Sequence, residues 1–205
     1  MTRFWTVCFV LVAVALLGVS PATAQPEELP LGSALPTIDG SLQDVTGGSV
    51  SVQELTGSSG TVFLFWSNQC PWIDKYEDRV QDLVSTFSGQ GIRFVLVNAN
   101  DASAFPQESA QASRQRAESA GYAATYVKDP NAALAQALGA SRTPHAFVFD
   151  VQNTLVYAGT IDDSPGDPAS VSNTYLRDAL TAVVAGNDVQ VADTKAFGCM
   201  IKFPQ

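Results

Sequence analysis

Residues 61–71 have the sequence TVFLFWSNQCP, and this stretch decides the fold. Its first six residues are β-branched or aromatic apart from one leucine, an apolar run that is typical of a buried strand. Apolar residues then recur at helical spacing from Ile73 to Phe87, so the sequence predicts a strand, a short turn and a helix. Cys70 lies where that helix begins, and Pro71 suits its first position because the missing N–H is not needed there.

The position of Cys70 indicates a reactive thiol. A side chain at a helix N-terminus faces unpaired backbone N–H groups and the positive end of the helix dipole. Both favour the thiolate, which is the nucleophilic form of cysteine. The alternative is an inert buried cysteine, which is a common fate of this residue type.

The first 24 residues have the pattern of a secretory signal peptide. Arg3 is the only charged residue before Glu27, residues 4–19 are almost entirely apolar, and the small residues PATA end the segment. We therefore expect cleavage after residue 24 and export of residues 25–205 to the periplasm or the extracellular space. A retained membrane anchor is the weaker alternative.

The charge and the cysteine count limit the function further. The net charge of −9, without basic clusters, argues against binding to nucleic acid or to anionic membranes. Two cysteines, Cys70 and Cys199, and one histidine, His145, follow the leader. An oxidising compartment permits a disulfide between the cysteines. The sequence leaves open whether they pair, and whether such a pair is a permanent structural bond.

The rest of the chain alternates strands and helices within a single predicted domain. A second apolar strand follows the first helix, which favours a parallel crossover with both sheet faces covered. The predicted elements are a β-hairpin in 32–55, strands at 61–66, 92–97 and 125–127, helices at 71–87 and 109–120, a brief helix capped by Asp129 with Pro130 in its first position, an antiparallel hairpin of 146–149 and 154–157, and an amphipathic helix ending at Gly186.

The order of these elements and several motifs resemble the thioredoxin fold, specifically its AhpC/TSA-type, peroxiredoxin-like redoxins. The motifs are the entry segments 32–36 and 48–55, the Cys-Pro-x-x turn within 65–73, the Thr143-Pro144 pair before a strand, and the tail 194–202 with Gly-Cys-x-Ile-Lys. The resemblance spans about residues 32–203. It implies an α/β fold with a central mixed β-sheet flanked by helices and an N-terminal β-hairpin.

The resemblance also implies a set of site residues. Cys70 matches the attacking cysteine, and Cys199 is the candidate resolving thiol. The implied active-site neighbours are Pro71, Trp72, Thr143, Pro144 and His145. The Thr143–Pro144 bond is implied to be cis, which leaves the backbone before the proline free to pair with a bound peptide or partner.

His145 has two interpretations. An imidazolium near Cys70 lowers the pKa of the thiol, so His145 is a candidate proton donor or charge partner. The alternative is a side chain that lies beside its strand without a direct role.

Two departures from the resemblance bear on the reaction. Ile73 stands where thioredoxins carry their second cysteine, and Phe63 stands where peroxiredoxins carry a proline before the reactive cysteine. The arginine usual in peroxiredoxins has no clear match, since Arg142 precedes the proline motif. Disulfide exchange is therefore favoured over peroxidase activity.

We thus expect an exported thiol–disulfide oxidoreductase that acts on protein or small-molecule disulfides, thiols or peroxides, with an external thiol as reductant and no cofactor. One alternative is a copper chaperone that binds Cu(I) through Cys70, Cys199 and His145. Another is a structural domain with a static Cys70–Cys199 bond. The physiological substrate, the electron donor and the oligomeric state are not indicated.

Overall fold

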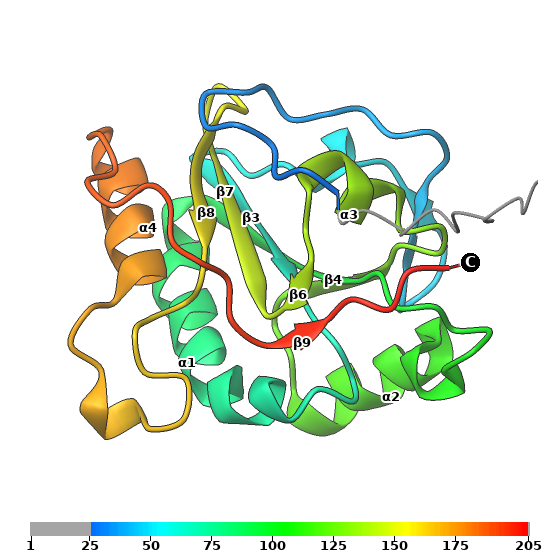
Figure 1. Cartoon of the computed structure of the whole chain (residues 1–205). Coiled ribbons are helices and arrows are strands. Elements are labelled where there is room, and N and C mark those ends of the chain that lie inside the picture. The colour runs from blue at the N-terminus through cyan, green and yellow to red at the C-terminus, as the bar shows by residue number, and fades with distance from the viewer. Residues whose placement is uncertain (1–25, 205) are drawn as a thin grey trace, which may run out of the picture.

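The computed structural model describes residues 26–204, so the predicted leader, 1–24, lies outside the described residues. Within 26–204, no helix is both long enough and apolar enough to cross a membrane. A seven-stranded sheet forms the centre, in the order β2-β1-β5-β4-β3-β7-β8 (Figure 1). Its strands are β1 Leu42–Asp44, β2 Ser49–Val50, β3 Gly60–Phe65, β4 Ile92–Asn98, β5 Thr125–Lys128, β7 His145–Asp150 and β8 Leu155–Gly159.

The sheet is mixed, as the resemblance implied. β3 pairs with β4 in parallel and with β7 in antiparallel register, and all six residues of β3 are buried. β1 and β2 form the predicted N-terminal hairpin, and β7 and β8 form the second. The fold is therefore the thioredoxin-like α/β fold that the motifs implied.

Helices cover both faces of the sheet. The α-helices are α1 Pro71–Phe87, α2 Ala110–Ala120, α3 Ala133–Leu138 and α4 Tyr175–Ala185, and the 3₁₀ segments are Gln53–Leu55, Ser88–Gln90, Pro106–Glu108 and Pro168–Ser170. Buried residues of α1 and α4 share one core cluster with Leu64 and Val148. Buried residues of α3 belong to the other cluster, on the opposite face, together with Phe63 and Phe147. The bounds of α1 match the prediction, with Pro71 in its first turn.

The start of α3 differs from the prediction. The helix begins at Ala133 rather than at Pro130, because a turn intervenes: the Ala132 N–H donates to the Asp129 carbonyl, and Ala132 has a φ of 53°. Asp129 nevertheless caps the helix, since its carboxylate accepts the N–H groups of Ala133 at 2.9 Å and Ala135 at 3.0 Å. The prediction that Asp129 binds the start of this helix is confirmed, but the N-cap residue is Ala132, and the predicted position of Pro130 was wrong.

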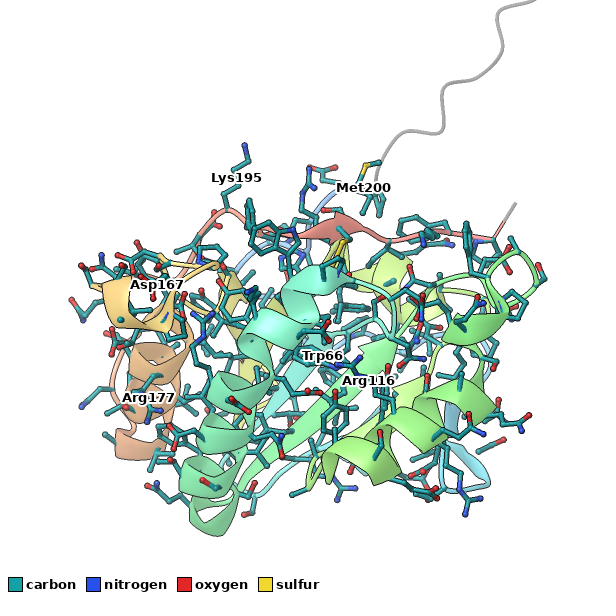
Figure 2. All side chains as sticks on the ribbon, turned by 90° about the horizontal axis from the view of Figure 1, so that it is seen from below. Trp66, Arg116, Asp167, Arg177, Lys195 and Met200 are labelled. Carbon is teal, nitrogen blue, oxygen red and sulfur yellow. A yellow bond between two sulfur atoms is a disulfide. The ribbon has the colours of Figure 1, made fainter. Side chains whose placement is uncertain are left out.

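The segment after α4 returns across the molecule as a tail, residues 186–204. It runs past β8, where the Thr194 N–H donates to the Ala158 carbonyl at 3.0 Å, and then forms strand β9, Cys199–Met200. β9 pairs in antiparallel register with β6, Arg142–Thr143, as a separate two-stranded sheet. Figure 2 shows this tail passing over the N-terminal end of α1.

Candidate functional site

Cys70 occupies the N-cap of α1, directly after the turn that follows β3. Its backbone is extended, with φ −80° and ψ 118°, and its side chain makes no capping hydrogen bond. The Cys70 N–H donates to Ser67 Oγ at 3.1 Å, which fixes the turn below the sulfur. The residue is 4% exposed and packs in the same core cluster as Ile73, the residue at the place of a second thioredoxin cysteine.

Cys70 is joined to Cys199 by a disulfide, which answers the pairing question that the sequence left open. The two Cα atoms are 6.0 Å apart although 129 positions separate them in the chain. The tail is anchored beside the bond by three contacts. Cys199 pairs with Thr143, the Ile201 N–H donates to the Ser141 carbonyl at 3.0 Å, and Arg142 Nη1 donates to the Gly198 carbonyl at 2.9 Å.

Gly198 allows the tail to lie this close to β6. Its φ is +144°, a conformation that residues with a side chain rarely adopt. A Cβ atom at this position would lie 2.1 Å from the carbonyl oxygen of Thr143. The glycine immediately before Cys199 is thus a requirement of the close pairing between β9 and β6.

The Thr143–Pro144 peptide bond is cis, as the resemblance implied. The Thr143 carbonyl oxygen lies 3.2 Å from Cys70 Sγ, so the proline segment faces the disulfide. The prediction that the backbone before the proline is free for a partner is wrong for this disulfide-bonded form, because the chain's own Cys199 pairs with Thr143. The physical reason is that the tail reaches this edge and is held there covalently.

Trp72 borders a groove beside the disulfide. Its ring makes an edge-to-face contact with Phe197, with the ring centroids 4.7 Å apart. The groove has a volume of about 430 Å³ and lies between the start of α1, the loop after β8 and the tail. Apolar and charged side chains line it together, among them Trp72, Tyr175, Phe197, Asp163 and Lys195.

His145 lies on the opposite side of the sheet from α1. Alternate residues of a strand point to opposite faces, and the neighbours Ala146 and Phe147 belong to the two different core clusters. The His145 ring packs against Phe147, with centroids 4.3 Å apart, and its Nε2 lies 3.3 Å from a Glu28 carboxylate oxygen. The structure therefore places the His145 ring beside Glu28 of the N-terminal segment, on the face of the sheet opposite to α1.

Glu108 is a site residue that the sequence analysis missed. It is fully buried beneath the Cys70 turn, where its two carboxylate oxygens accept three hydrogen bonds. The donors are the Ser67 hydroxyl at 2.6 Å, the Asn68 N–H at 2.9 Å and Asn98 Nδ2 at 2.8 Å. Because Ser67 Oγ in turn accepts the Cys70 N–H, the buried carboxylate holds the backbone on which Cys70 sits.

The same polar network continues to the tail. Asn98 Oδ1 accepts the Asn100 N–H at 3.1 Å, and Asn100 Oδ1 accepts the Lys202 N–H at 3.0 Å. The buried ammonium of Lys128 donates to Asn98 Oδ1 and to the Asn100 carbonyl. Burial lowers the pKa of Lys128 to about 8, while the nearby Glu108 opposes that shift. One buried network thus fixes both the Cys70 turn and the segment that follows Cys199.

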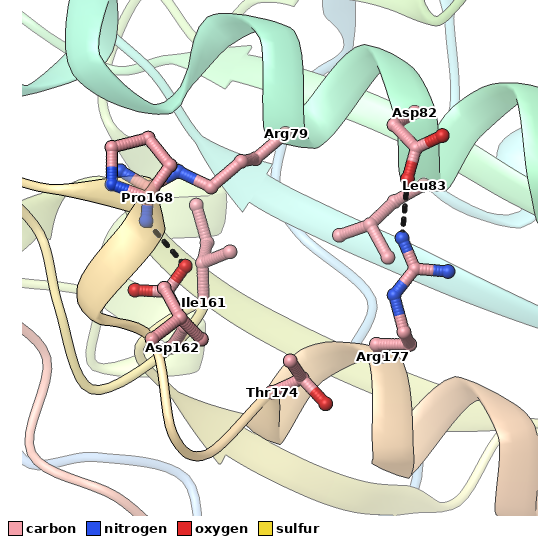
Figure 3. A pocket seen from close by; sticks show the side chains of 9 residues that line it. Arg79, Asp82, Leu83, Ile161, Asp162, Pro168, Thr174 and Arg177 are labelled. Atoms are coloured by element: carbon pink, nitrogen blue, oxygen red, sulfur yellow. Dashed lines mark hydrogen bonds and ion pairs between the residues drawn. The ribbon is translucent and has the colours of Figure 1, made fainter.

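A second hollow, of about 220 Å³, lies between α1 and α4 (Figure 3). Arg79 from α1 pairs there with Asp162, and Arg177 from α4 pairs with Asp82. Each guanidinium has a carboxylate partner, so the hollow holds no uncompensated positive charge for an anion. Arg79 also donates to the carbonyls of Ser164 and Pro165, which fixes the loop beside the Trp72 groove.

The copper alternative finds no geometric support in the described residues. No group of three or more histidine, cysteine, aspartate or glutamate side chains within 26–204 is arranged to hold a metal ion. His145 faces Glu28 on the far side of the sheet, whereas the two sulfurs are bonded to each other.

The fold, the disulfide at a helix start and the cis-proline beside it define a redoxin. The chain belongs to the AhpC/TSA family, which matches residues 31–158. Membership in this family indicates thiol-dependent oxidoreductase activity. The chain matches no curated protein sequence.

Solved structures share the thioredoxin-like fold of this chain. A hypothetical protein from Sinorhizobium meliloti is 32% identical, with a TM-score of 0.79 over 88% of this chain and 98% of that one. An uncharacterised conserved protein from Geobacillus kaustophilus is 31% identical, with a TM-score of 0.79 over 85% and 93%. A secreted disulfide oxidoreductase from Mycobacterium tuberculosis shares the fold, at 14% identity and a TM-score of 0.51 over 74% and 96%.

Proposed function

We propose that this protein is a thiol–disulfide oxidoreductase in which Cys70 and Cys199 cycle between a dithiol and a disulfide. The observation that carries the proposal is the bond between Cys70, at the first turn of a 17-residue helix, and Cys199, beside cis-Pro144. Backbone N–H groups at the helix start favour the ionised form of a thiol placed there. A second cysteine already lies within bonding reach of that thiol.

The proposed oxidation of the dithiol has two steps. The Cys70 thiolate attacks one sulfur of a substrate disulfide, and the other substrate sulfur leaves as a thiolate. Cys199, deprotonated to a thiolate, then attacks Cys70 Sγ in the mixed disulfide, which releases the second substrate thiolate and forms the Cys70–Cys199 bond. The substrate gains two electrons and the protein loses two.

Disulfides are preferred over peroxides as substrates of Cys70. Phe63 replaces the proline of the peroxiredoxin motif, and it is fully buried in the core cluster on the α3 side of the sheet. Arg142 donates to the Gly198 carbonyl and serves to hold the tail. Neither residue supplies the polar surroundings with which a peroxidase activates a peroxide oxygen.

The proposed location is outside the cytoplasm. The support is the apolar leader with its small-residue end in residues 1–24, together with the disulfide, which persists in oxidising compartments. Partners are then exported proteins or small molecules that carry thiols or disulfides.

The test is a comparison of two oxidants on the reduced protein. We expect oxidised glutathione or a disulfide-bonded peptide to form the Cys70–Cys199 bond faster than hydrogen peroxide at equal concentration. Peptide mapping after alkylation of the remaining thiols measures the fraction of protein that carries the Cys70–Cys199 bond at each time. Faster oxidation by peroxide contradicts the preference for disulfides, and a Cys70 thiol that alkylates no faster than an ordinary thiol at neutral pH contradicts the proposed function.

A further inference from the structure

The groove beside the disulfide is built in part by the two segments that carry the cysteines. Trp72 follows Cys70 by two positions in α1 and lines the groove. Phe197 precedes Cys199 by two positions in the tail, and its ring contacts the Trp72 ring. Tyr175 adds a third aromatic side chain. The volume of about 430 Å³ falls in the range of small-molecule sites, so a small molecule bound here lies beside the disulfide.

The opposite wall of the groove is held in place by the protein's own bonds. This wall is the loop 160–166 that follows β8. Arg79 pairs with Asp162 and also donates to two carbonyls of the loop. The Thr160 N–H donates to Thr194 Oγ1 at 3.0 Å, which ties the loop to the tail. A groove that is shaped in advance binds a ligand without the entropic cost of ordering its walls.

Two opposite charges at this groove lack an ionic partner. Asp163 lies in the loop, where hydrogen bonds from Asn173 and Ser172 lower the pKa of its carboxyl, so that it is ionised at neutral pH. Lys195 lies in the tail at the rim of the groove, and its side chain extends into solvent (Figure 2). Within residues 26–204, neither group forms an ion pair, with the other or with a third residue. Asp162, the remaining charged residue of the lining, is already paired with a guanidinium.

This pattern of charges is complementary to a ligand that carries both an ammonium and a carboxylate group. Cysteine and glutathione carry both groups on one small molecule, as thiols and as disulfides. The carboxylate of such a molecule suits Lys195, and its ammonium suits Asp163. The aromatic side chains of the groove accommodate its methylene groups.

An extended polypeptide fits this disulfide-bonded form less well. A cysteine within a polypeptide has no free ammonium or carboxylate on its own backbone. The edge at Thr143, where an extended peptide would pair, is occupied by Cys199 of the tail. The groove, in contrast, is open while the tail is docked, because residues of the tail form part of its lining. The form with the bond closed therefore accommodates a small molecule rather than an extended chain.

We propose that this groove selects amino-acid thiols and their disulfides, of the type of cysteine and glutathione, as the exchange partners of the Cys70–Cys199 bond. Lys195 and Asp163 determine this specificity by binding the carboxylate and the ammonium of the partner. The inference rests on the proposed function and names its substrate class. In the reduction, two thiol molecules lose two electrons and two protons and join as a disulfide, and the two protein sulfurs take up both electrons and both protons as thiols. The reverse reaction oxidises the protein.

Four small thiols test this specificity. Cysteine carries both charges, N-acetylcysteine lacks the ammonium, cysteine methyl ester lacks the carboxylate, and 2-mercaptoethanol lacks both. The rate at which each thiol reduces the oxidised protein is measured at low ionic strength by acid quenching, alkylation and mass spectrometry. Each rate is divided by the rate of the same thiol with hydroxyethyl disulfide, which removes differences in intrinsic reactivity. The selectivity for a thiol is its normalised rate relative to that of 2-mercaptoethanol.

Wild type should have its highest selectivity for cysteine. Lys195→Gln should lower the selectivity for cysteine and N-acetylcysteine by about two- to fivefold and leave that for the methyl ester unchanged. Asp163→Asn should lower the selectivity for cysteine and the methyl ester by a similar factor and leave that for N-acetylcysteine unchanged. Arg114→Gln and Glu118→Gln are the matched controls, because these exposed residues of α2 pair with each other and the variants remove the same charges. Both controls should keep the wild-type selectivity.

Equal selectivity in wild type and in both groove variants overturns the inference and leaves the proposed exchange intact. An equal loss in the control variants also overturns it, because the effect then comes from the net charge and not from the groove. A cysteine-containing peptide with blocked termini that reacts faster than cysteine on the normalised scale overturns it in favour of a polypeptide partner. A bond that none of the thiols reduces overturns the proposed function together with the inference.

Discussion

Replacing Glu108 tests whether a buried carboxylate holds the Cys70 turn. Glu108→Ala removes the acceptor of three hydrogen bonds, two buried ones from Ser67 and Asn98 and a partly buried one from the Asn68 N–H. Asn98 Nδ2 keeps a second acceptor, the Ser113 hydroxyl at 3.2 Å, so two donors lose their partner. A buried donor without a partner costs about 1–3 kcal/mol, and with partial relaxation we expect a loss of about 2–4 kcal/mol in the free energy of unfolding.

Urea unfolding of the oxidised protein, followed by far-UV circular dichroism, measures this change. Glu118→Ala is the matched control on α2, because Glu118 is exposed and pairs with the exposed Arg114. That variant should unfold with wild-type stability. Glu108→Gln keeps one carbonyl acceptor and should fall between wild type and Glu108→Ala. If Glu108→Ala is as stable as Glu118→Ala, the Glu108 carboxylate does not hold the Cys70 turn.

Three further predictions concern Lys128, Gly198 and Cys199. Lys128 loses its proton near pH 8 in the folded protein and near pH 10.5 in the unfolded chain. Below pH 8 the buried ammonium therefore destabilises the folded state, and this cost decreases as the pH rises from 8 to 10.5. The stability of wild type relative to Lys128→Met should accordingly rise by about 1–2 kcal/mol from pH 8 to 9.5 in urea unfolding, and an unchanged difference contradicts the buried charge. Gly198→Ala places a Cβ against the Thr143 carbonyl, so the equilibrium constant for forming the disulfide with glutathione should fall by about tenfold or more. If the variant has the same equilibrium constant as wild type, the close approach at Gly198 is not required for the bond. Cys199→Ser removes a cross-link spanning 129 positions and should lower the free energy of unfolding by about 4–5 kcal/mol in the chain-entropy model. Equal urea midpoints for this variant and the oxidised wild type would refute this prediction.

The local patterns of the sequence were sufficient to predict most of the fold. The strand at 60–65, the helix at 71–87 and the pair of strands around 150–153 each follow from periodicity within a few residues. The position of Cys70 at a helix start follows from the same signal, since Pro71 fixes the first turn.

The site depends on contacts that local patterns do not encode. β9 is two residues long and pairs with a strand more than fifty positions earlier, so no periodicity marks it. The glycine before Cys199 was the available signal, because a glycine often marks a close backbone approach. Glu108 lies in a polar segment without a motif, and only the fold shows that its carboxylate is buried beneath Ser67.

In the proposed function, the bond between Cys70 and Cys199 opens and closes during each reaction cycle. A redox titration in glutathione or dithiothreitol buffers, with alkylation and mass spectrometry of the Cys70 and Cys199 peptides, measures its potential. Labile exchange disulfides have potentials above about −300 mV, and permanent structural bonds lie below that value. We predict that the Cys70–Cys199 bond has a potential above about −300 mV and forms and breaks reversibly. If the bond is still oxidised below about −300 mV, it is a permanent structural cross-link and the proposed exchange is wrong.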